Sequence, residues 1–113
     1  MMKIYHNPRC RKSREGLQIL EGSKQDFEVV LYLENTPSYD ELKSIIQKLG
    51  IAPIDLVRKG EKDWKENFKG KDLSDKEIIE AMTTYPKLIE RSIVIKGNKA
   101  VVGRPPEKIK DLL

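Results

Sequence analysis

The hydrophobic pattern at the start of the chain predicts a strand, a helix and a second strand. Residues 3–6 predict a first strand around the apolar pair Ile4-Tyr5, and residues 12–21 have helical spacing that ends near Gly22. Residues 27–33 are rich in β-branched and aromatic side chains, which is typical of a strand. The links between these elements are short, so the two strands should be parallel, with a right-handed crossover through the helix.

A helical block is predicted next. Apolar residues recur at i, i+3, i+4 and i+7 between residues 42 and 49, after a capping-box spacing from Ser38 to Glu41 and before Gly50. Residues 54–59 have the pattern of a short helical turn. Residues 59–72 are charged and glycine-punctuated, and we expect Trp64 and Phe68 to be their apolar anchors.

A second capping box, from Ser74 to Glu77, predicts a helix that runs to about Thr84. The strand-like runs 93–96 and 99–102 then flank Gly97-Asn98, which favours a hairpin with a type II′ turn. A last short helix should follow Arg104-Pro105-Pro106 and present three apolar residues inward. These are Ile109, Leu112 and Leu113.

This order of elements predicts the α/β class. A thioredoxin-like fold fits it, with a mixed four-stranded sheet and a helical insertion, residues about 37–90, between the second and third strands. We expect residues 1–113 to form one domain, because a chain of 113 residues is long enough for a single core.

Composition narrows the possible environments and partners. No apolar run approaches the ~20 residues of a membrane span, and no signal-peptide pattern precedes Lys3. The net charge of +4 comes from interleaved Lys, Arg, Asp and Glu, without the basic and aromatic clustering of nucleic-acid binders. We therefore expect binding to neither membrane nor nucleic acid. The single cysteine suits a reducing cytoplasm, which is the location we expect, and we expect a monomer.

Cys10 is the single cysteine of the chain, so any thiol chemistry must occur there and no internal disulfide can form. With one cysteine and one histidine, we expect no metal site and no bound cofactor. The predicted strand-to-helix turn places the thiol at the positive end of a helix, among unpaired amide N–H groups. Four basic residues add to the positive electrostatic potential at this turn and favour the nucleophilic thiolate. They are Arg9, Arg11, Lys12 and Arg14.

The simplest alternative is that Cys10 is a small buried apolar residue, as free cysteines often are. Its polar and basic neighbours argue against that position. The same field that favours a thiolate also attracts an oxyanion, so a reaction between a thiolate and an anion is the chemistry that this turn predicts.

Five segments of the chain form a pattern when they are taken in order. The first is His6-Asn7-Pro8-x-Cys10-x-x-Ser13-Arg14, and the others are residues 31–38, 57–59, 90–94 and 103–105. Together they resemble the bacterial-type ArsC family of arsenate reductases, which are linked to glutathione and glutaredoxin, and its Spx-type relatives. The first segment is similar to the active-site motif of that family.

The resemblance implies an oxidoreductase that reduces arsenate, or a related glutathione-linked thiol reaction. Cys10 would attack the oxyanion, glutathione would be the co-substrate, and glutaredoxin would clear the mixed disulfide. Arg58, Arg91 and Arg104 would form an oxyanion clamp, since guanidinium groups bind tetrahedral oxyanions in a bidentate way. His6, Ser13 and Arg14 would support the thiolate. Each arginine alone could instead be an ordinary surface charge.

The resemblance leaves one alternative function open and excludes another. An Spx-like regulator that binds RNA polymerase without catalysis is the alternative, although Ser13 stands where a Cys-x-x-Cys disulfide switch needs cysteine. The phosphatase-like arsenate reductases need Cys-x5-Arg, and Gly16 occupies that spacing. Ser92 follows Arg91 where the family usually has proline, and we expect a trans peptide bond there.

Overall fold

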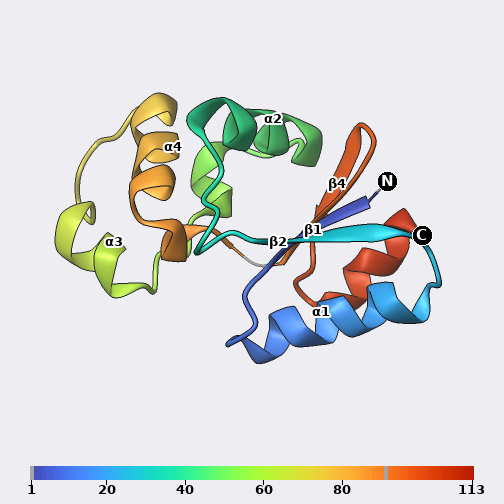
Figure 1. The fold of residues 1–113 in the computed structure, drawn as a ribbon. Coiled ribbons are helices and arrows are strands. Elements are labelled where there is room, and N and C mark those ends of the chain that lie inside the picture. The colour runs from blue at the N-terminus through green and yellow to red at the C-terminus, as the bar shows by residue number, and fades with distance from the viewer. Residues whose placement is uncertain (1, 91) are drawn as a thin grey trace. The chain divides into compact units, whose positions relative to one another are not determined.

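The computed structural model describes residues 2–90 and 92–113 (Figure 1). It divides the chain into two compact units. We call Met1–Asn35 with Arg91–Leu113 the sheet unit, and Thr36–Glu90 the helical unit.

The sheet unit contains four strands in the order β2-β1-β3-β4. The central strand β1 pairs in parallel with β2 and antiparallel with β3, and β3 pairs antiparallel with β4. The predicted β-α-β start, the C-terminal hairpin and the mixed sheet are therefore confirmed. The strands are β1 (Met2–His6), β2 (Phe27–Leu31), β3 (Ile93–Lys96) and β4 (Lys99–Val102).

One apolar core joins the sheet of this unit to α1 (Arg11–Gly22) and to the 3-10 helix η3 (Pro106–Leu112). Figure 1 shows these two helices side by side, and they are in contact. The buried residues of this core are Met2, Ile4, Leu20, Val94 and Ile109. The expectation that Leu113 faces inward is wrong, because its side chain lies past the end of η3 and is 40% exposed.

The helical unit is built from three α-helices and two 3-10 helices among the residues described. They are α2 (Tyr39–Leu49), η1 (Pro53–Leu56), α3 (Lys62–Asn67), α4 (Asp75–Thr84) and η2 (Pro86–Leu88). The predicted caps are present. Ser38 Oγ accepts a hydrogen bond from the Glu41 N–H (3.2 Å), and Gly50 ends α2 with φ 68°.

Two predicted elements differ from the observed ones, and one observed helix was not predicted. Strand β2 ends at Leu31 rather than residue 33, because the Leu31 carbonyl accepts hydrogen bonds from the N–H groups of Glu34 and Asn35 (2.9 and 2.8 Å) and so starts a turn. The turn predicted at 54–59 is the shorter η1. Helix α3 was not predicted, because its sequence lacks a helical apolar stripe. It is anchored by Trp64, whose ring packs against Phe68.

Ser92 lies at a tight junction between α1, η3 and the end of β4. It is fully buried, and its hydroxyl has no hydrogen-bond partner among the residues described. A Cβ added to Gly16 would lie 2.7 Å from Ser92 Oγ and 2.9 Å from Ile109 Cδ1. A Cβ on Gly103 would meet the same two side chains. Glycine at both positions is therefore what lets these segments approach so closely.

The peptide bond between Arg91 and Ser92 lies outside the described residues, so its predicted trans geometry stays a prediction. The bond between Arg104 and Pro105 is cis.

We predict that Gly16→Ala destabilises the protein by about 1–3 kcal/mol, because the new methyl group overpacks a closed junction. Gly22→Ala is the matched control: it lies in the same helix, and an added Cβ meets no atom within 4 Å. Urea unfolding followed by circular dichroism should show a lower midpoint for Gly16→Ala and an equal or higher one for Gly22→Ala. Equal midpoints for the two variants would refute the close-packing argument.

Candidate active site

Cys10 is the N-cap residue of α1, at the end of the turn that leaves β1. Its N–H donates to the Asn7 carbonyl (3.0 Å), and its own carbonyl accepts from the Arg14 N–H (3.0 Å). The residue is half-buried, with φ −100° and ψ 123°. The structure therefore places the thiol where the sequence predicts it, at the N-terminus of a twelve-residue helix.

A buried hydroxyl holds this turn together. Ser13 is fully buried, and its Oγ lies 2.7 Å from His6 Nδ1 and accepts a hydrogen bond from the Asn7 N–H (3.0 Å). Because Oγ accepts the Asn7 proton, it can donate its own proton to a neutral His6 ring, which leaves Nε2 protonated. Ser13 thus links the last residue of β1 and the first residue of the turn to the first turns of α1.

Burial lowers the pKa of His6 below its ordinary value of 6.5. The positive charge of Arg14 lowers the pKa further, while a hydrogen bond with the Ser13 backbone and the charge of Glu21 raise it. His6 is therefore neutral at pH 7, in agreement with its role as the partner of a hydroxyl rather than of a carboxylate.

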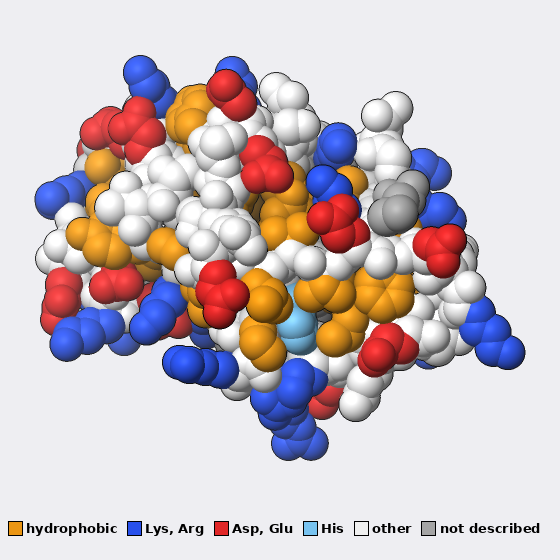
Figure 2. Space-filling view, viewed as in Figure 1, with side chains coloured by type: hydrophobic (Ala, Val, Ile, Leu, Met, Phe, Trp, Pro, Cys, Tyr) orange, Lys and Arg blue, Asp and Glu red, His pale blue; other side chains and the backbone are white. Residues whose placement is uncertain are grey.

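The outer side of the turn is basic. Arg9, Arg11, Lys12 and Arg14 are all exposed, and Figure 2 shows basic side chains gathered over the start of α1. Arg14 Nη1 donates to the Pro8 carbonyl (2.9 Å), and Arg11 pairs with Glu15 (3.4 Å). The first turn of α1 contains no acidic residue.

Charge is also unequal between the two units. The sheet unit has 12 Lys and Arg against 7 Asp and Glu, whereas the helical unit has 10 against 11. The net positive charge of the chain therefore belongs to the unit that carries the thiol.

The three arginines of the predicted clamp come from different places. Arg104 follows β4 in the sheet unit, the unit of Cys10, and its side chain is exposed. Arg58 belongs to the helical unit. Arg91 lies outside the described residues. The convergence of the three on one oxyanion stays a prediction.

Arg58 has two carboxylate partners that the sequence analysis missed. Its Nη1 donates to Glu61, and its Nε lies 3.9 Å from a carboxylate oxygen of Glu90. The i, i+3 spacing could have indicated Glu61. Glu90 is far away in sequence, and Arg58 and Glu90 meet because residues 57 and 89 form a β-bridge. These carboxylates fix the direction of the guanidinium group and reduce its net field.

Two further findings concern metal binding and membrane insertion. Across residues 2–90 and 92–113, no group of three His, Cys, Asp or Glu side chains could hold a metal ion. Within the same ranges, no helix has the length and apolar character needed to cross a bilayer.

We predict that the protein loses stability as the pH falls below about 6.5, through the lowered pKa of His6. In that window the unfolded chain binds a proton that the folded chain does not, so acid lowers the free energy of unfolding. His6→Gln keeps a hydrogen-bonding group beside Ser13 and should flatten this part of the profile. Urea unfolding between pH 7.5 and 5.5 measures it, and parallel slopes for the two proteins would contradict the assignment.

Comparison with known proteins identifies the family. The sequence matches the ArsC family over residues 5–112. It is 44% identical over 112 residues to an arsenate reductase of Haemophilus influenzae, covering 97% of each chain. It is 43% identical over 114 residues to the uncharacterized protein YfgD of Escherichia coli, covering 99% of this chain and 96% of the other.

Solved structures agree with the sequence relatives. An arsenate reductase from Vibrio cholerae superposes with a TM-score of 0.94 at 44% identity, covering 99% of this chain and 97% of that one. The predicted thioredoxin-like architecture is thereby confirmed. With a family match across almost its whole length and relatives above 40% identity, the chain belongs to the ArsC family.

Proposed function

We propose that this protein is an arsenate reductase, or an oxidoreductase of a closely related oxyanion, that uses Cys10 as its nucleophile and glutathione as its reductant. The observation that carries the proposal is the position of Cys10: the single thiol of an ArsC-family chain is the N-cap of α1, inside a basic turn. The relatives named arsenate reductase supply the substrate class.

The site favours the thiolate for two additive reasons. The free N–H groups at the start of α1 carry partial positive charge, and the basic side chains of the turn add full charges. The link from His6 through Ser13 to Asn7 holds the turn in place without adding a charge, because it consists of a neutral ring, a hydroxyl group and a backbone N–H. The thiolate is thus stabilised by fixed dipoles and cations rather than by a neighbouring base.

The proposed reaction begins with attack of the Cys10 thiolate on the arsenic atom. A sulfur–arsenic bond forms, and one arsenate oxygen leaves as water after protonation. The thiolate of glutathione then attacks Cys10 Sγ, and the electron pair of the sulfur–arsenic bond passes to arsenic, which leaves as arsenite. The remaining mixed disulfide between Cys10 and glutathione needs an external thiol, because the chain has no second cysteine. Glutaredoxin fits that role, and a cytoplasmic location fits a reaction that consumes reduced thiols.

Arg58, Arg91 and Arg104 are the proposed clamp for the oxyanion. A guanidinium group presents two parallel N–H donors to a tetrahedral anion, which a lysine ammonium cannot do. Arg104 is the best placed for a test, because it lies in the same compact unit as Cys10 and is exposed.

We predict that Lys12→Glu raises stability while it lowers thiolate formation. A carboxylate in the first turn of α1 interacts favourably with the helix dipole, by about 0.3–1 kcal/mol, but it repels the Cys10 anion. In wild type, thiolate absorbance near 240 nm should titrate below the free-thiol value of ~8.5, and higher in the variant. Lys99→Glu makes the same charge change on an exposed side chain of the sheet unit, at the end of the sheet opposite to the Cys10 turn, and should leave the thiol titration unchanged. A wild-type midpoint at or above the free-thiol value would refute the activated thiolate.

We predict arsenate-dependent NADPH consumption in the presence of glutathione, glutaredoxin and glutathione reductase. Cys10→Ser should abolish it, and Arg104→Lys should reduce kcat/KM roughly tenfold or more, since a bidentate contact is lost. Arg9→Lys is the matched control, because Arg9 is an exposed arginine of the Cys10 turn outside the proposed clamp. No turnover by wild type would refute the proposed substrate. Equal effects of the two Arg→Lys changes would refute the role of Arg104.

A further inference from the structure

The helical unit contains a hollow that the thiol chemistry does not use. It has a volume of about 350 Å³ and lies between the end of α3, the segment that follows it, and α4. Four residues of α4 line it, at positions 77, 80, 81 and 84, and this i, i+3, i+4, i+7 spacing makes them one face of the helix. All of the lining residues belong to one compact unit, so the hollow is a feature of that unit alone.

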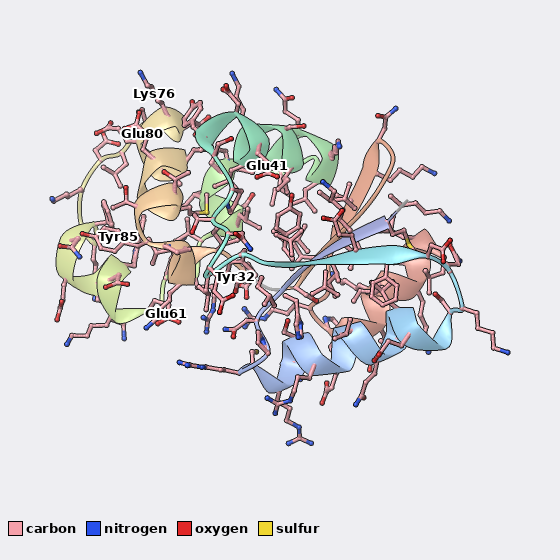
Figure 3. All side chains as sticks on the ribbon, in the orientation of Figure 1. Tyr32, Glu41, Glu61, Lys76, Glu80 and Tyr85 are labelled. Carbon is pink, nitrogen blue, oxygen red and sulfur yellow. The ribbon has the colours of Figure 1, made fainter. Side chains whose placement is uncertain are left out.

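Two aromatic rings form a corner of the hollow. The ring planes of Phe68 and Tyr85 stand at 75° to each other, with centroids 5.7 Å apart. Leu73 and Ala81 complete an apolar floor. Figure 3 shows Tyr85 at the end of α4 and Glu80 higher on the same helix. The face of an aromatic ring carries partial negative charge, so a cation that reaches a ring face at this corner is attracted to it and an anion is not.

The rim of the hollow carries two carboxylates and one ammonium group, from Glu77, Glu80 and Lys71. Hydrogen bonds from the Ser74 backbone and side chain lower the pKa of Glu77, so it remains ionised under ordinary conditions. Glu80 is exposed and has no ion-pair partner within the described part of the chain. The rim is therefore net negative.

We propose that this hollow is a docking site for an arginine side chain of a partner polypeptide. A guanidinium group is planar and weakly hydrated, so it can stack on Phe68 or Tyr85 while its N–H groups bond to the Glu80 carboxylate. The hollow is of the size that holds a single side chain rather than a folded element. The proposal goes beyond the proposed function and does not depend on it.

Trp64 provides a direct reporter of binding. It is the only tryptophan of the chain, and its ring packs on Phe68, with centroids 5.5 Å apart. An occupant that touches Phe68 should therefore change the tryptophan fluorescence.

The test is a titration of the full chain with a short capped peptide that contains one arginine, followed by Trp64 fluorescence. The control peptide carries citrulline, which has the shape of arginine without its charge. We expect saturable binding in the millimolar range that is roughly tenfold weaker with citrulline. Glu80→Gln should weaken arginine binding, whereas Glu66→Gln, an equal charge change on α3 outside the hollow, should leave it unchanged. Both side chains are exposed, so both variants should fold.

Lys71→Met supplies an independent check, because it removes the cation that competes with the ligand at the rim. It should tighten arginine binding, and weaker binding would show that the hollow prefers an anion and would overturn the proposal. Equal affinities for arginine and citrulline peptides, an unchanged affinity in Glu80→Gln, or the absence of saturable binding would overturn it as well. Loss of arsenate turnover has no bearing on this result, since Cys10→Ser should bind the peptide like wild type.

Discussion

The placement of Cys10 depends on a hydroxyl group that water does not reach. Ser13 Oγ joins the end of β1, through His6, to the first turns of α1, and it also accepts the first N–H of the turn between them. Strand β1 is hydrogen-bonded on both edges, to β2 and to β3, so it provides a rigid reference. A buried polar group that loses its partner costs free energy, and the turn is held in one geometry for that reason. The thiol takes its position at the helix N-terminus from this network.

Two features of α1 and its contacts lower the free energy of unfolding. A helix start normally gains from acidic residues, and α1 has basic ones there. At the junction of α1 with η3, Ser92 keeps a buried hydroxyl that has no hydrogen-bond partner among residues 2–90 and 92–113. Neither feature helps folding. The first is explained by the proposed chemistry, since cations that oppose the helix dipole favour a thiolate and attract an oxyanion. For the Ser92 hydroxyl, the structure offers no functional explanation.

Local signals in the sequence were sufficient for most of the fold. Ser38, Gly50 and the Ser74 capping box act within a few residues, so the ends of α2 and the start of α4 could be predicted. Features that depend on distant partners could not. Helix α3 is anchored by Trp64 and Phe68, and Phe68 packs in turn on Tyr85, which is distant in sequence. The end of β2 was missed for a local reason: the strand-like run continues to residue 33, although the Leu31 carbonyl already accepts hydrogen bonds from the N–H groups of Glu34 and Asn35.

The features of the candidate active site also fall into local ones, which the sequence predicts, and long-range ones, which it does not. The position of Cys10 follows from a strand and a helix that adjoin it in sequence, and the Ser13 contact with His6 spans only seven residues. The pairing of Arg58 with Glu90 spans more than thirty, and no pattern in the sequence indicates it. The roles of Arg58, Arg91 and Arg104 in binding an oxyanion rest on the resemblance to the ArsC family, and they stay predictions.

In the proposed mechanism, Cys10 reacts with an oxyanion and is then oxidised to a mixed disulfide with glutathione. Mass spectrometry of the intact protein can detect this disulfide after incubation with arsenate and glutathione and without glutaredoxin. We expect a mass increase of one glutathionyl group, located on Cys10 and dependent on arsenate, because the chain has no second cysteine to clear the mixed disulfide. An unmodified Cys10, or a modification that forms equally without arsenate, would refute this mechanism.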